Sequence, residues 1–83
     1  MNITLYRNGG MRDNPVHITA ADHRTQWEIR TVALIDAFRA IRAILELTES
    51  TVHTITIDIN PQLREYVGQR LAQCNALLVY KDY

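Results

Sequence analysis

Residues 53–59 constrain the fold of this chain more than any other segment. They read HTITIDI, so that isoleucine occupies every second position. A period of two predicts a strand whose isoleucines face the core and whose threonines and Asp58 face away. Asn60 and Pro61 follow at once, which is the pattern of an N-cap residue with proline in the first helical position. Because one side of this strand is polar, it indicates a sheet with one face exposed to water.

Alternation of the same kind predicts strands in the N-terminal part of the chain. Residues 3–7 and 25–31 alternate, and residues 16–19 form a shorter candidate. Residues 19–22 resemble a capping box, which leaves a competing interpretation in which one long helix runs from there to Leu47. Residues 20–31 can therefore be read as strand or as helix, and the alternation of Trp27 and Ile29 with polar neighbours favours strand.

Two segments have the period of a helix. The first covers residues 32–47 and carries one apolar stripe: Leu34, Phe38, Ile41 and Leu45. The second starts after Asn60, stops near Asn75 and carries another: Leu63, Val67, Leu71 and Cys74. The apolar arc of the first helix is wider than one sheet face requires. This predicts self-association, with Ile35, Ile44 or Leu47 partly exposed in the single chain.

These elements predict a single small α/β domain over residues 1–83. Its fold class is a two-layer α/β sandwich of the α+β or α/β type. A mixed sheet of four to five strands, the last over residues 76–80, carries both helices on one face in the order β-β-(β)-α-β-α-β. The residues expected to share one core are Trp27, Ile29, Leu34, Phe38, Ile41, Leu45, Ile55, Ile57, Leu63, Val67 and Leu71.

Charge and cysteine content narrow the function classes. Nine basic and nine acidic residues give a net charge of zero, whereas a dedicated nucleic-acid binder has a basic excess. Cys74 is the only cysteine, which excludes an internal disulfide and fits a reducing compartment. No signal-peptide pattern and no apolar run of about 20 residues is present. We therefore expect a cytoplasmic protein that does not bind membranes.

No residues have the spacing of a catalytic or cofactor motif. His17, His23 and His53 are not at metal-ligand spacing, and a cysteine on a buried helical stripe acts as a small hydrophobe. The glycines that follow Asn8 do not lead into a helix, so they lack the context of a phosphate-binding loop. We predict a protein that is not an enzyme and has no catalytic, cofactor-binding or metal-binding residues.

The exposed face of the sheet is the first candidate binding surface. The residues predicted to lie on it are Tyr6, His17, Gln26, Glu28, Arg30, Thr54, Thr56, Asp58 and either Tyr80 or Leu78. Tyr6, Arg30 and Tyr80 are the candidate anchors, because tyrosine and arginine concentrate binding energy in interfaces. Arg39 and Arg42, on the polar side of the first helix, are a second candidate. A solvated face with no binding role accounts for the same residues.

The leading hypothesis is a non-enzymatic protein-interaction module, either a homodimer or an inhibitor or adaptor of a host or partner protein. Its size, neutral charge and lack of motifs resemble those of small bacterial or phage accessory proteins, and that resemblance implies binding to another protein. The alternative is weak nucleic-acid binding through the exposed sheet face and the N-terminal arginines, which are Arg7, Arg12, Arg24 and Arg30. Steep salt dependence would distinguish the alternative.

Two residues of the second helix keep two interpretations each. Arg70 falls within the apolar stripe. Either the aliphatic part of its side chain packs against the core while its guanidinium group reaches water, or the guanidinium is partly buried and pairs with an acidic residue. Gly68 costs about 1 kcal/mol relative to alanine in a helix. It is either a tolerated surface residue or a site where a partner backbone approaches closely.

Overall fold

The computed structural model describes residues 1–7, 15–22, 26–48 and 53–81. Their elements follow the predicted order, with the third N-terminal strand present. They are β1 (Asn2–Arg7), β2 (Val16–Ala21), β3 (Gln26–Thr31), α1 (Leu34–Leu47), β4 (Thr54–Asp58), a 3-10 turn (Pro61–Leu63), α2 (Arg64–Leu71) and β5 (Leu77–Tyr80). Arg12, Arg24, His23 and the Asn8-Gly9-Gly10 segment lie outside the described residues.

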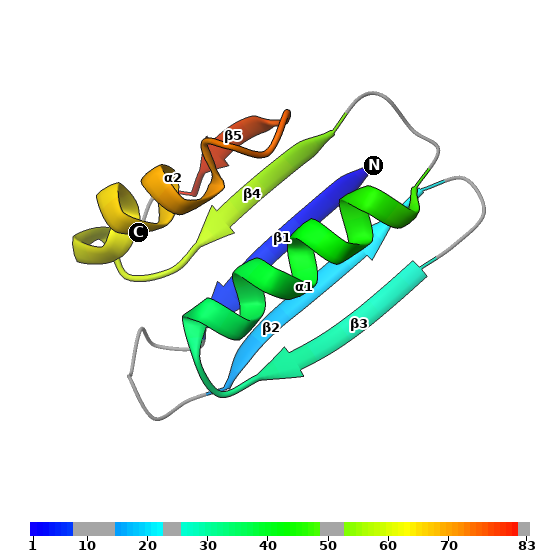
Figure 1. Cartoon of the computed structure of the whole chain (residues 1–83). Coiled ribbons are helices and arrows are strands. Elements are labelled where there is room, and N and C mark those ends of the chain that lie inside the picture. The colour runs from blue at the N-terminus through cyan, green and yellow to red at the C-terminus, as the bar shows by residue number, and fades with distance from the viewer. Residues whose placement is uncertain (8–14, 23–25, 49–52, 82–83) are drawn as a thin grey trace.

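The five strands form one mixed sheet in the order β3-β2-β1-β4-β5. β1, β2 and β3 are antiparallel neighbours, whereas β4 is parallel to β1 and β5 is parallel to β4. Both helices lie on the same side of this sheet, with α1 over β1 and β2 and α2 beside β4 and β5 (Figure 1). The structure therefore confirms the two-layer α+β sandwich.

Residues 26–31 form a strand, so the competing long helix is wrong. β3 pairs with β2 along its whole length, from Gln26 opposite Ala21 to Thr31 opposite Val16. Trp27 and Ile29 face the core and the residues between them face water, as alternation requires. The helix begins only at Leu34, where the period changes from two to 3.6.

All eleven residues predicted to share one core belong to it. Six are buried, and Trp27, Ile29, Leu34, Leu45 and Leu63 are half-buried against the others. Further buried residues of the core are Ile3, Leu5, Val16, Ile18 and Ala20 from the sheet, and Ile59, which follows β4 and is buried as the alternation of residues 53–59 predicts. One cluster thus connects both helices with the sheet.

The boundaries of the second helix differ from those predicted at its C-terminal end. The Asn60 side chain accepts a hydrogen bond from the backbone N–H of Gln62 at 3.0 Å, which confirms the N-cap. The helix ends at Leu71 rather than near Asn75, because the chain already turns there toward β5. Cys74 lies in this turn, where its N–H donates to the carbonyl of Leu71 at 3.0 Å. It is half-buried and is not part of a helical stripe.

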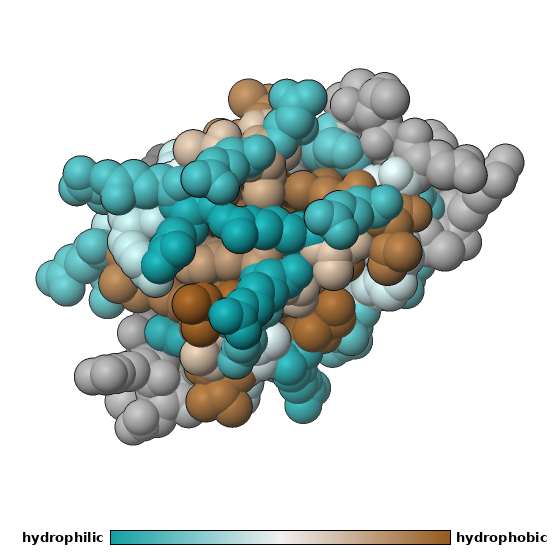
Figure 2. All heavy atoms as spheres, viewed as in Figure 1, coloured by the Kyte–Doolittle hydropathy of each residue, from teal (hydrophilic) through white to brown (hydrophobic). Residues whose placement is uncertain are grey.

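The side of α1 that faces away from the sheet carries exposed apolar residues. Ile35 is 43% exposed and Leu47 is 75% exposed, as expected, whereas Ile44 is buried because it faces the sheet. On this side of the molecule hydrophobic and hydrophilic residues are interleaved (Figure 2). No helix among the described residues has the length and apolar character needed to cross a membrane.

Candidate functional site

The side of the sheet opposite the helices is covered by no described helix or strand. We call it the outer face. It consists of the residues that alternate with the core positions of each strand: Asn2, Thr4 and Tyr6; His17, Thr19 and Ala21; Gln26, Glu28 and Arg30; Thr54, Thr56 and Asp58; Leu77 and Val79. Neither helix covers it (Figure 1).

Strand register places the polar residues of the outer face in a row across the sheet. Arg30 lies opposite His17, His17 opposite Tyr6, and Tyr6 opposite Asp58. The rings of Tyr6 and His17 are 6.0 Å apart at their centroids and tilted by 49°. Two of the predicted anchors, Tyr6 and Arg30, therefore share one row, with His17 between them.

The row ends in a partly buried ion pair. The Asp58 side chain is 12% exposed, and its Oδ2 lies 3.5 Å from Nζ of Lys81. Because Lys81 neutralises this carboxylate and Arg30 stands beside Glu28 along β3, positive and negative charges on the face nearly cancel.

The outer face is least polar over β5. Leu77 is 66% exposed and Val79 is 41% exposed. Thr54 lies opposite Leu77 and Thr56 opposite Val79, and both threonines are half-buried. Leu77 and Val79 thus form an apolar strip beside Thr54 and Thr56, and we call these four residues the β4–β5 strip.

Tyr80, the third predicted anchor, lies on the other side of the sheet, so its predicted position is wrong. It lies opposite Ile57 and shares the helix side with that core residue. Its hydroxyl sits where a Cβ at Gly68 would be, and the Arg64 guanidinium lies 5.9 Å from its ring centroid. The close approach that Gly68 permits is therefore made by Tyr80 of the same chain.

The face on which Tyr80 lies could not be predicted from its neighbours, because residues 76–80 are apolar at nearly every position. A strand of this composition has no period of two, and its side-chain direction depends on pairing with β4. For the same reason the β4–β5 strip was missed. The only signal for it was the short length of the strand between Asn75 and Lys81.

Arg39 and Arg42 lie on α1, away from the outer face. Arg39 forms an exposed ion pair with Asp36 at 3.9 Å, and Arg42 Nη2 donates to the carbonyl of Arg70 at 3.3 Å. The Arg70 side chain is exposed, with its guanidinium 5.6 Å from the centroid of the Tyr66 ring. The five candidate residues thus occupy three separate surfaces, and only Tyr6 and Arg30 are brought together.

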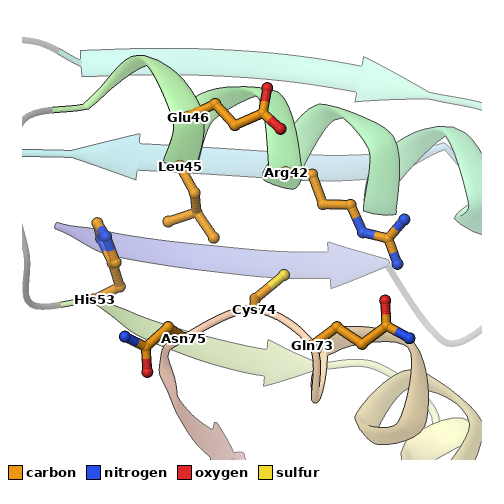
Figure 3. A pocket seen from close by; sticks show the side chains of 7 residues that line it. All are labelled: Arg42, Leu45, Glu46, His53, Gln73, Cys74 and Asn75. Atoms are coloured by element: carbon orange, nitrogen blue, oxygen red, sulfur yellow. The ribbon is translucent and has the colours of Figure 1, made fainter.

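A hollow of about 400 Å³ lies between α1 and the turn that follows α2. Arg42, Leu45 and Glu46 line it from the helix, and His53, Gln73, Cys74 and Asn75 line it from the opposite side (Figure 3). Arg42 and His53 lie at opposite ends, with the Cys74 sulfur between them. No hydrogen bond between the Cys74 thiol and a basic side chain is found among the described residues, so this part of the chain gives no evidence of an activated cysteine nucleophile.

His53 lines this hollow from the side opposite α1. Burial lowers the pKa of His53 below its ordinary value of 6.5, and the nearby α-ammonium group lowers it further. Its Nδ1 is buried and has no hydrogen-bond partner among the described residues. Protonation of His53 therefore opposes folding.

Among the described residues, no group of three or more histidine, cysteine, aspartate or glutamate side chains could hold a metal ion. Comparison of the chain with known protein families, with characterised proteins and with solved structures finds no match in any of the three. Inference about function therefore depends on the surfaces themselves.

Proposed function

We propose that this chain is a non-enzymatic protein-interaction module that acts as an adaptor or inhibitor in the cytoplasm. Its binding surface is the outer face, and its partner contributes an amphipathic helix that lies on the β4–β5 strip. The observation that carries the proposal is that no described helix or strand covers the outer face of the parallel half of the sheet, β1, β4 and β5.

Parallel strands are found almost only in sheets that are covered on both faces, whereas antiparallel strands tolerate water on one face. Here the antiparallel half carries Gln26, Glu28 and Arg30 on its outer side, which suits solvent. The parallel half carries the exposed apolar residues Leu77 and Val79, which are not suited to contact with solvent. A helix laid along β4 and β5 would complete the three-layer arrangement that is usual for parallel strands.

An amphipathic helix is the occupant that suits this surface best. Its apolar stripe would cover Leu77, Val79 and the threonine methyl groups, as in other complexes where a helix lies in an apolar groove. A polar residue near its end would meet Asp58 and Tyr6. The near-cancelling charges of the face argue against the alternative, nucleic-acid binding, which depends on phosphate neutralisation.

The test compares two synthetic peptides of identical composition. One has leucine at positions i, i+3, i+4 and i+7, and the other is scrambled. Each is titrated into the isotope-labelled chain while amide chemical shifts are followed by NMR. We expect the periodic peptide alone to shift resonances of the β4–β5 strip.

Two variants with similarly exposed positions sharpen the test. Val79→Asp places a charge on the strip and should abolish these shifts, because a carboxylate cannot be buried unpaired under an apolar helix. Ile35→Asp changes a residue of nearly equal exposure, 43% against 41%, on the helix side and should leave them intact. Shifts confined to α1 and α2 would refute the proposed surface. Salt-sensitive shifts with an oligonucleotide would favour the alternative.

A further inference from the structure

The outer edge of β3 is a six-residue strand edge that no described strand covers. Proteins protect such edges with proline, bulges, very short strands, inward-pointing charges or charged side chains along the edge. Of these devices β3 has only the charges of Glu28 and Arg30, which are opposite in sign and so do not repel a second copy of the same strand. β3 reads QWEIRT and contains neither proline nor glycine, and its inward positions are Trp27, Ile29 and Thr31. An edge of this kind is suited to pairing with another strand.

The charges of β3 have no partners within the described part of the chain. Glu28 and Arg30 are both exposed, and no ion pair joins either of them to another described residue. Their cross-strand neighbours on β2 are Thr19 and His17. Opposite charges two residues apart on one face allow an edge strand to pair with a second copy of itself in antiparallel orientation, because each charge can then lie opposite a charge of the other sign.

Side-chain direction and charge together select one register for two copies of β3. Residues directly opposite each other in an antiparallel pair lie on the same face of the sheet. The two-fold axis that relates the two copies must therefore pass through the position of one residue, which then lies opposite the same residue of the second copy. An axis through position 28 would oppose two glutamates, and an axis through position 30 would oppose two arginines. An axis through Ile29 opposes Glu28 to Arg30 of the second copy, and does so twice.

The core side of β3 supports the same register. Trp27 and Ile29 are only half-buried, since α1 contacts β2 and β3 but no described helix or strand lies beyond the edge. With the axis through Ile29, the two copies of this isoleucine lie opposite each other, and Trp27 lies opposite Thr31 of the second copy. Pairing would therefore bury apolar surface that the single chain leaves exposed.

We propose that the outer edge of β3 binds a second copy of this chain. The two strands pair in antiparallel orientation about Ile29, and the product is one continuous sheet with all helices on the same side. This inference does not rest on the proposed function, because the β4–β5 strip lies at the opposite edge of the sheet. Failure of either one leaves the other open to its own test.

Charge reversal tests both the surface and its register. Sedimentation equilibrium of the full chain should give a monomer–dimer equilibrium. Glu28→Arg and Arg30→Glu, made separately, each convert two attractive pairs into two repulsive ones and should raise the dissociation constant about tenfold or more. The double variant E28R/R30E restores both pairs with reversed sign, and its dissociation constant should return to within about threefold of the original.

A second measurement and a control keep the result unambiguous. Trp27 is the only tryptophan, so its fluorescence emission should shift to shorter wavelength with increasing protein concentration. The concentration dependence of this shift should match that of the dimer fraction measured by sedimentation. Glu65→Arg makes the same charge change on an exposed position of α2 and should not alter the dissociation constant. A chain that stays monomeric, single variants that dimerise normally, or a double variant that fails to recover would each overturn the proposal.

Discussion

Replacing Gly68 by alanine tests how tightly Tyr80 is held between α2 and the sheet. Alanine is favoured over glycine within a helix by about 1 kcal/mol, so an isolated helix would gain stability. In this fold the new Cβ would overlap the Tyr80 hydroxyl and would lie 3.7 Å from the ring carbon that bears it. The ring must then move or α2 must shift.

Neither movement is free, because the Tyr80 ring is part of a small cluster. The Arg64 guanidinium lies 5.9 Å from the ring centroid, and Arg64 Nη2 donates to the Lys81 carbonyl at 2.7 Å. Overpacking of this kind costs about 1–3 kcal/mol. We therefore expect Gly68→Ala to lower the free energy of unfolding by about 0–2 kcal/mol, against a gain of about 1 kcal/mol if the site were open.

A double-mutant cycle measured by urea unfolding separates the two contributions. Tyr80→Phe removes the hydroxyl, and in that background Gly68→Ala should recover a gain of about 1 kcal/mol. The coupling energy should then be about 1–3 kcal/mol, within the range found for side chains in direct contact. Gln69→Ala, one residue along the same helix, should have the same small effect in both backgrounds. A Gly68→Ala variant that is stabilised equally with and without the hydroxyl would refute the reasoning.

Two further predictions concern His53 and Asn60. Since the folded chain lowers the pKa of His53, the unfolded chain binds the proton more readily, and the free energy of unfolding should be highest above about pH 6.5 and fall as the pH drops toward the folded-state pKa. His53→Gln should remove this part of the pH dependence in urea titrations, and an unchanged slope would contradict it. Asn60→Ala should cost about 1 kcal/mol, because it removes the acceptor for the Gln62 N–H, whereas Asn60→Asp should retain most of the stability; equal losses in both would show that the cap is not the cause.

The parts of the fold that follow from local patterns could be predicted from the sequence. Alternation at residues 26–31 identified β3 against a plausible helix, and Asn60 with Pro61 marked the start of the second helical segment. Its end could not be predicted, because the apolar spacing from Leu71 to Cys74 continues the helical period although the chain has already turned. Strand order is set by pairing between distant residues and leaves no local signal.

Prediction of the candidate site was limited in the same way, because local patterns place some of its residues and only pairing between distant strands places the others. Tyr6 and Arg30 lie on strands with clear alternation, so their face was correctly assigned. Tyr80 lies on a strand that is apolar at nearly every position, and only its register with Ile57 reveals that it faces the helices. The β4–β5 strip became visible only when Thr54 and Thr56 were placed opposite Leu77 and Val79.

The two proposed surfaces have a combined consequence that follows from symmetry. A two-fold axis through Ile29 is perpendicular to the sheet, so it keeps both outer faces on one side of the dimer. Each copy then presents its own β4–β5 strip at an outer end of the continuous sheet, since β5 lies at the edge farthest from β3. A partner with two suitable helices joined by a linker long enough to reach both strips would bind the second one within the same complex, which can strengthen binding by about 10²–10⁴-fold. Dimerisation through β3 would therefore set the spacing at which such a partner is recognised, while the strips alone determine which helix is accepted.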